Sequence, residues 1–184
     1  VFIEDQLGYN VMIDFLLARR NFIKNKLPIV GPENENYWSF GDSYIKGAWI
    51  MHTLRHVIDN DSLWWSILKS FAVENARSHV NTADFQRHVE ARTDENFSYF
   101  FDQYFLDHRP PKLEYSQDGN KLFYRWADVI PNFQMPLDVN INGIEKRIYP
   151  TAAVQILQVP EFPVVIFRNW EFLISVKENS ALGG

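Results

Sequence analysis

Two histidines four residues apart are the first candidates for chemistry in this sequence. His52 and His56 lie in the stretch SYIKGAWIMHTLRH (43–56), whose apolar spacing predicts a helix. Zinc hydrolases hold their metal with this spacing in the motif H-E-x-x-H, in which the glutamate is the general base. Thr53 stands where that glutamate would be, and a hydroxyl without an activating partner cannot accept a proton from metal-bound water. The pair therefore lacks the catalytic half of the motif.

A packing role for the pair is the simpler hypothesis. We expect His52 to pack under Trp49 and His56 to lie near the surface. The other histidines fall on loops and on a polar helix and are expected to be solvated: His79, His88 and His108. The alternative is that His52 and His56 bind a metal with a further ligand brought by folding or by a partner chain. Stoichiometric zinc that is lost in a His52→Ala variant would support this alternative.

The elements that would position these residues are helices in the first part of the chain. Apolar residues recur there at helical intervals, and a loop rich in Pro, Gly and Asn at 25–42 interrupts them. Arg109-Pro110-Pro111 ends the last helix, since proline cannot continue the hydrogen-bond ladder. Helices are predicted over 1–24 (with Gly8 as a possible interruption), 43–60, 63–76, 82–92 and 95–108. Their predicted starting or capping residues are Asp42 or Ser43, Asp61 or Ser62, Thr82, and Asp94.

After Pro111 the apolar period changes from helical to alternating. Asp118-Gly119-Asn120 and Asn142-Gly143 each separate two alternating runs, a strong hairpin signal. Two further runs, 152–159 and 164–176, complete about six or seven short strands. Helices followed by antiparallel strands predict an α+β fold with two segregated units. We expect a helical unit over 1–110 and a small antiparallel β-sandwich over 111–184.

Composition excludes several functional classes. The 184 residues are 46% hydrophobic, enough to bury a core, and the net charge of -5 gives no general attraction to nucleic acid or anionic membranes. No apolar run approaches the roughly 18 residues of a membrane helix. The chain has no Cys, which excludes disulfides and thiolate metal sites but leaves the cellular compartment unknown.

The first residues suggest a missing upstream part. The chain opens on Val1 within an amphipathic run, with neither a basic n-region nor a cleavage site. We expect that the N-terminal part of a larger protein is absent. A cut through a helical domain would expose apolar surface, so we also expect possible self-association of this chain.

Four segments, in order, resemble one enzyme family. YIKGAWIMHTLRHVIDND (44–61) is similar to the Y-x-K-G-A segment of the aminopeptidase N-like zinc metallopeptidases, the gluzincins. The other three segments are RRNFIKNKLPIVGP (19–32), NTADFQRHVEARTDENFSYFFDQYFLDHRPPKLEY (81–115) and FQMPLDVNING (133–143). Their order over nearly the whole chain is more specific than any one of them.

The resemblance implies a fold and indicates which catalytic groups this chain would supply. The helical unit would be the C-terminal part of a thermolysin-like catalytic domain. The zinc ligands of the family lie upstream of this stretch, so this chain is expected to bind no metal, and Glu4 is not assigned as a ligand. In the family, the tyrosine that matches Tyr44 donates a hydrogen bond to the oxyanion of the tetrahedral intermediate. A phenol suits this role because it stays protonated at pH 7.

The residues around Tyr44 receive weaker assignments. We expect Lys46 to pair with a carboxylate or cover the helix start, and Gly47 to allow close helix packing. Tyr37, Trp38 and Phe40 lead into Tyr44 and could line a substrate pocket, although packing explains them equally well.

The first functional hypothesis is therefore a fragment of a zinc-dependent aminopeptidase that hydrolyses N-terminal residues of peptides. The fragment alone would be inactive, because it lacks the zinc site. The alternative is a non-catalytic module that binds a peptide or protein, derived from a metallopeptidase whose upstream zinc motif has degenerated.

Overall fold

Helices come first and strands follow in the computed structural model, which describes residues 2–32, 35, 37 and 41–183. The described helices are α1 (Phe2–Leu7), α2 (Tyr9–Arg20), α3 (Asp42–Ile58), α4 (Asp61–Glu74), α5 (Thr82–Thr93) and α6 (Ser98–Phe101), which continues as the π-helical turn η1 (Asp102–Leu106). The strands are β1 (Lys112–Asp118), β2 (Lys121–Ala127), β3 (Leu137–Ile141), β4 (Ile144–Ile148), β5 (Gln155–Gln158), β6 (Val165–Phe167) and β7 (Ser175–Glu178), and a 3₁₀ turn, η2 (Ser180–Gly183), ends the chain. The α+β fold class is confirmed.

Local residues explain most helix boundaries. Gly8, at a φ of 88°, separates α1 from α2, as the sequence suggested. The caps differ from those predicted: Asn60 accepts a hydrogen bond from the Leu63 amide, and Asn81 forms a capping box at the start of α5. The prediction that Asp94 starts the last helix is wrong, because Asp94 is the left-handed residue that ends α5.

The strands form two sheets. The order is β5-β2-β1-β7 in the four-stranded sheet and β4-β3-β6 in the three-stranded sheet. Both predicted hairpins are present, since β1 pairs antiparallel with β2 and β3 pairs antiparallel with β4. Asn142 and Gly143 both have positive φ, as a tight hairpin turn requires. The expectation of purely antiparallel strands is wrong in one place, because β7 pairs parallel with β1.

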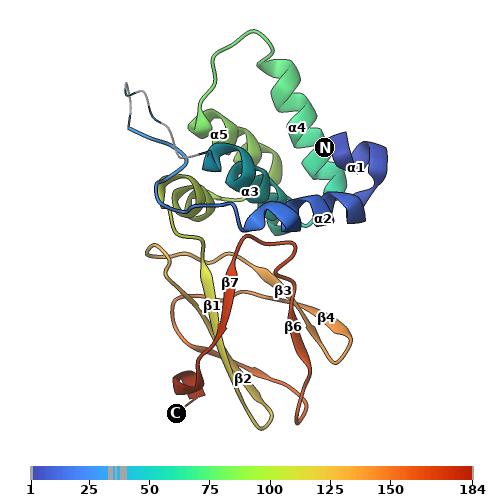
Figure 1. Cartoon of the computed structure of the whole chain (residues 1–184), viewed down its shortest axis with the longest axis vertical. Coiled ribbons are helices and arrows are strands. Elements are labelled where there is room, and N and C mark those ends of the chain that lie inside the picture. The colour runs from blue at the N-terminus through green and yellow to red at the C-terminus, as the bar shows by residue number, and fades with distance from the viewer. Residues whose placement is uncertain (1, 33–34, 36, 38–40, 184) are drawn as a thin grey trace.

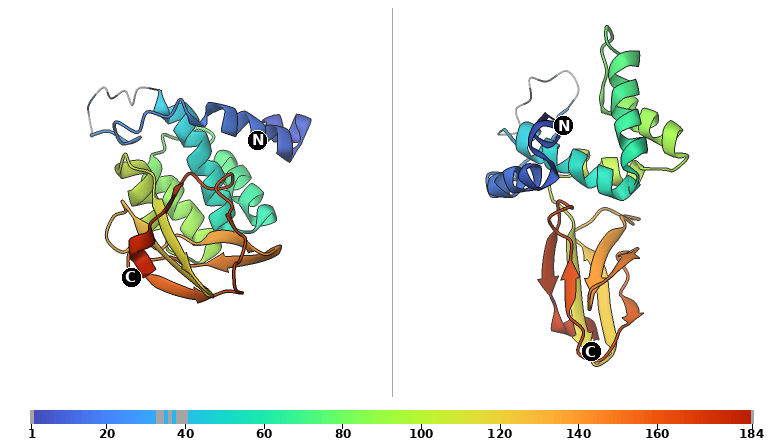
Figure 2. Two further views of the ribbon diagram at one scale, coloured as in Figure 1. Left: turned by 60° about the horizontal axis from the view of Figure 1, so that its bottom comes forward. Right: turned by 90° about the vertical axis from the view of Figure 1, so that its right-hand side faces the viewer.

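The helices and the sheets occupy opposite ends of the molecule (Figure 1). The two sheets lie face to face in the right-hand view of Figure 2, and the C-terminus is at the end far from the helices. The rings of Tyr115 on β1 and Phe167 on β6 lie 4.8 Å apart and join the two sheets. No helix within the described residues is long and apolar enough to cross a membrane.

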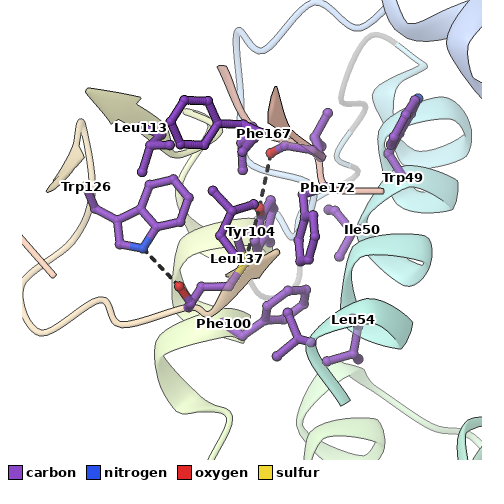
Figure 3. Close-up of a cluster of buried hydrophobic side chains, with 14 of the residues drawn as sticks. Trp49, Ile50, Leu54, Phe100, Tyr104, Leu113, Trp126, Leu137, Phe167 and Phe172 are labelled. Carbon is purple, nitrogen blue, oxygen red and sulfur yellow. Dashed lines mark hydrogen bonds between the residues drawn. The ribbon is translucent and has the colours of Figure 1, made fainter. Parts of the chain in front are cut away.

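One continuous core joins the helices to the strands (Figure 3). Ile50 of α3 lies beside Phe172, which follows β6, and both side chains are fully buried. The Tyr104 hydroxyl donates to the carbonyl oxygen of Leu173 at 3.1 Å, a bond drawn in Figure 3. The segment between β6 and β7 is therefore packed directly onto the helices.

Candidate functional site

Tyr44 lies in the first turn of α3, on a backbone that its neighbours hold in place. Gly41 precedes the helix at a φ of 85°, where a left-handed conformation favours glycine. The buried Asp42 carboxylate accepts hydrogen bonds from the backbone amides of Lys24 and Asn25, both at 2.8 Å. Asp42 thus anchors the segment after α2 to the start of α3, and the prediction that Asp42 or Ser43 caps this helix is wrong.

A second anchor, Lys46, lies about one turn beyond Asp42 along α3. The side chain of Lys46 is fully buried, and its Nζ donates to the carbonyl oxygen of His108 at 2.8 Å. Burial lowers the pKa of Lys46, while the carboxylates of Asp42 and Asp107 oppose this shift. The predicted carboxylate partner is thus replaced by a backbone carbonyl. The helix-packing role predicted for Gly47 is wrong, because a Cβ built there would meet no described atom within 4 Å.

The side chain of Tyr44 projects outward between these two anchors. It is 74% exposed, although the helix turn that carries it is fixed by the buried Asp42 and Lys46. Within the described part of the chain, its hydroxyl makes no hydrogen bond. This geometry leaves a phenolic donor, on a fixed backbone, free to serve a group outside this chain.

The aromatic residues that precede Tyr44 are described only in part. The Tyr37 hydroxyl donates to the carbonyl oxygen of Pro28 at 2.6 Å. Its ring covers Gly31, where a Cβ would come within 2.1 Å of the Tyr37 Cγ. Tyr37 therefore packs against Gly31 and Pro28, and its hydroxyl proton is already used in a hydrogen bond. Trp38 and Phe40 lie outside the described residues.

The histidine pair lies further along α3, with His52 roughly 12 Å and His56 roughly 18 Å from Tyr44 along the helix axis. His52 is 6% exposed and packs edge-on against Trp49, with ring centroids 6.0 Å apart, so its predicted packing role is confirmed. His56 is not near the surface as predicted, because only 18% of its side chain is exposed. Its Nε2 lies 3.1 Å from the Tyr9 hydroxyl, and its ring centroid is 4.6 Å from that of His52.

Burial keeps both rings neutral at pH 7. Burial, reinforced by the positive charge of Arg55, lowers the pKa of His52 to about 4. Burial, His52 and Arg55 together lower the pKa of His56 to about 3. The opposing contributions, a hydrogen bond of His52 to the Trp170 backbone and the negative charge of Asp61, do not offset burial, so we interpret the pair as a neutral packing element.

The residues around the pair do not fit a zinc site. Arg55 lies between the two histidines in sequence and donates to both carboxylate oxygens of Glu4 at 2.8 Å. The same guanidinium makes two bonds of 2.7 Å to the Asp61 carboxylate. Both acidic side chains are therefore held by a cation, which would repel a metal ion. Among the described residues, no group of three or more His, Asp or Glu side chains could hold a metal ion.

The remaining histidines were predicted to be solvated. His79 is exposed, and 47% of the His108 side chain is exposed, in agreement with this prediction. The prediction is wrong for His88, whose side chain is 8% exposed. Its Nε2 lies 3.0 Å from the Ser70 hydroxyl, because α4 packs against α5 at this point.

The neutral state of His56 predicts acid sensitivity. The folded protein holds this pKa at about 3, against 6.5 in the unfolded chain. Between these values the unfolded chain binds more protons, so the contribution of His56 to stability is complete above pH 6.5 and is lost as the pH falls. From pH 7 to pH 5 this loss should be about 2 kcal/mol. Urea unfolding should show that wild type loses about 2 kcal/mol more than His56→Gln over this interval.

The exposed His79 provides the control for that comparison. His79→Gln should keep the acid sensitivity of wild type, because the His79 side chain is exposed and lies outside the buried pair. Glu171 acts in the opposite direction, since burial raises its pKa to about 7 and its protonation favours the fold below that value. Glu171 is present in wild type and in both variants, so its contribution cancels when their losses of stability are compared. Equal losses in wild type and His56→Gln would contradict the proposed neutral state.

A polar cluster around His56 was missed at the level of sequence. Tyr9, Arg168 and Glu171 join His56 in lining a cavity of about 520 Å³. They come from α2, from the end of α3 and from the segment between β6 and β7. No spacing rule connects residues so far apart, so no signal in the sequence could have found this cluster.

Comparisons with known proteins bear on the fold. No protein-family model matches the chain, and no curated protein matches it in sequence. Among solved structures, aminopeptidase A of Legionella pneumophila, in complex with aspartic acid, matches with a TM-score of 0.61 at 17% identity. The match covers 97% of this chain and 22% of that chain. This chain thus shares a fold with about a fifth of an aminopeptidase, and the likeness is one of fold.

Proposed function

We propose that this chain is part of a zinc-dependent aminopeptidase of the aminopeptidase N-like family and is inactive by itself. The observation that carries the proposal is the setting of Tyr44, an exposed phenol on the anchored first turn of α3. The fold likeness to an aminopeptidase supports it. From the Y-x-K-G-A resemblance, we assign this tyrosine the role of oxyanion donor.

In this proposal Tyr44 is a hydrogen-bond donor for the oxyanion that forms when a peptide bond is attacked. A preorganised donor of this kind is typically worth about 3 to 4 kcal/mol of transition-state stabilisation. The anchoring of Asp42 and Lys46 supplies the preorganisation, because it fixes the helix turn before substrate arrives. The metal and the general base would come from another part of the full-length protein, since the described residues of this chain do not form a zinc site.

The surface of the first helices supports the presence of a further part of the catalytic domain. An apolar cavity of about 500 Å³ opens between α1, α2, α3 and α4 and is lined by Met12, Met51 and Trp65, among others. Phe2 is 76% exposed beside it. We propose that the remaining part of the catalytic domain covers this surface in the full-length protein, and that the isolated chain could self-associate through it.

Two further assignments belong to the same proposal. We place the boundary between the catalytic part and a small β-sandwich domain at residues 110 and 111. The substrate pocket would include Trp38 and Phe40, and the ring of Tyr37, since the hydroxyl of Tyr37 is bonded to Pro28.

Metal removal in the full-length protein tests this function. The full-length protein should release the N-terminal residue from aminoacyl-coumarylamide substrates. A chelator should abolish this activity, and added zinc should restore it. The 184-residue chain should show no turnover under the same conditions. A full-length sequence without H-E-x-x-H upstream of Val1, or activity that resists chelation, would instead favour the non-catalytic peptide-binding module.

A further inference from the structure

The polar cavity beside His56 contains more negative than positive charge. It lies where α1, the end of α3 and the start of α4 meet β3 and the segment that follows β6. Five carboxylates line it, against two guanidinium groups, those of Arg55 and Arg168. The carboxylates are Glu4, Asp59, Asp61, Asp138 and Glu171. An excess of carboxylates does not by itself make a binding site. Whether the cavity can bind a cation depends on which carboxylate oxygens lack a partner within the protein.

All five carboxylates have a cationic partner, and for four of them no buried oxygen is left without a hydrogen bond among the described residues. Arg55 bonds to Glu4 and Asp61, as described above. Arg147, which lies behind the cavity lining, bonds to Asp138 at 2.9 Å and lies 3.6 Å from Asp59. None of these four carboxylates needs a ligand.

Glu171 differs, because only one of its two oxygens is satisfied. Its Oε1 accepts a bond from the Arg168 guanidinium. Its Oε2 has no hydrogen-bond partner among the described residues, although Glu171 is only 2% exposed. A buried carboxylate oxygen without a donor is costly, typically more so than a neutral group. Burial accordingly raises the pKa of Glu171 to about 7.

The group nearest to this oxygen is His56. Its Nδ1 lies 3.8 Å from Glu171 Oε2, beyond hydrogen-bond distance, and the ring is neutral, so the two form no ion pair. The other ring nitrogen, Nε2, is held by the Tyr9 hydroxyl. Because Oε2 and Nδ1 are 3.8 Å apart, a single donor atom beside them could lie at hydrogen-bond distance from both. When Tyr9 accepts the proton of Nε2, Nδ1 is free to accept.

We propose that this cavity binds a small organic cation through its primary ammonium group, which donates to Glu171 Oε2 and to His56 Nδ1. A primary ammonium offers one positive charge and three donors in a compact group. It would neutralise the buried carboxylate oxygen of Glu171, which has no partner among the described residues. The volume of about 520 Å³ lies within the range of small-molecule sites. The proposal is independent of the aminopeptidase assignment, because every residue it uses belongs to this chain.

A methylation series tests the site in the unaltered 184-residue chain. We would titrate the ¹⁵N-labelled protein with methyl-, dimethyl-, trimethyl- and tetramethylammonium chloride at pH 8, with total chloride held constant. At this pH Glu171 is largely ionised. Methylammonium should give saturable shifts near His56 and in the 168–174 segment, with an affinity at least about tenfold higher than that of tetramethylammonium. Absence of saturation, or equal affinity across the series, would overturn the proposal and leave a bridging water as the natural occupant.

A pair of matched variants locates the site. Glu171→Gln should weaken methylammonium binding by about tenfold or more, because a charged acceptor is replaced by a neutral one. Glu178→Gln, which changes an exposed glutamate at the end of β7, should leave the affinity unchanged. Equal affinities in both variants would overturn the proposal. Should Glu171→Gln fail to fold, the methylation series in wild type decides alone.

Discussion

Replacement of Tyr44 by Phe in the full-length enzyme should lower kcat by about 10²- to 10³-fold, the typical cost of removing one oxyanion donor. The change deletes only a hydroxyl from a side chain that is 74% exposed and makes no hydrogen bond within the described part of the chain. Stability and zinc content should therefore stay the same. Steady-state kinetics with a coumarylamide substrate, together with metal analysis, would measure these effects.

A second phenol provides the control for this variant. Tyr149 is 62% exposed and follows β4, in the part of the chain that forms the strands. Tyr149→Phe should keep the kcat of wild type. A Tyr44→Phe enzyme that retained full turnover would remove Tyr44 from the mechanism, while the chelation experiment would still test the aminopeptidase assignment.

Replacement of Arg20 by Met should lower the free energy of unfolding by about 3 to 5 kcal/mol. The Arg20 guanidinium donates to three backbone carbonyls between β6 and β7, those of Asn169, Phe172 and Ile174. It also lies over the ring of Trp49, 4.7 Å from the centroid. Hydrogen bonds to charged groups are worth about 1.5 to 3 kcal/mol each, and they are not additive. Urea unfolding followed by tryptophan fluorescence would measure the loss.

The neighbouring arginine provides a matched control. Arg19 is exposed, and within the described part of the chain its guanidinium donates only to the carbonyl of Phe15 in the same helix. Arg19→Met should therefore change the free energy of unfolding by less than about 1 kcal/mol. Comparable losses in the two variants would mean that Arg20 does not join the helices to the 168–174 segment.

Apolar periodicity determined the order of the elements. The change from helical to alternating spacing at Pro111 correctly predicted helices followed by strands, because that spacing reports which side of each element is buried. Turn residues with special backbone conformations were equally informative. Gly8 ends α1, and Asn142-Gly143 forms a hairpin turn, since few other residues adopt positive φ at low cost.

The resemblance, rather than periodicity, drew attention to Tyr44. Its exposure agrees with a role toward a group outside the chain, but an exposed phenol alone does not identify an oxyanion donor. Of the histidines that first suggested chemistry, His52 is a buried packing residue and His56 is partly buried beside a polar cavity. Thr53, which stands in place of the glutamate of H-E-x-x-H, was the sequence feature that argued against a catalytic metal site. In the structure its hydroxyl accepts a hydrogen bond from the Leu173 amide at 2.8 Å, 120 residues away.

Only the tertiary structure decided which distant groups meet. Alternation along a strand does not reveal the direction of its neighbour, so the parallel pairing of β7 with β1 could not be foreseen. Nor does helical spacing indicate that Lys46 is buried against a carbonyl, or that Glu171 lies beside His56. Sequence patterns determine which side of each element is buried. The groups that meet there depend on how the elements pack, and this packing leaves Tyr44 exposed and one oxygen of Glu171 without a partner.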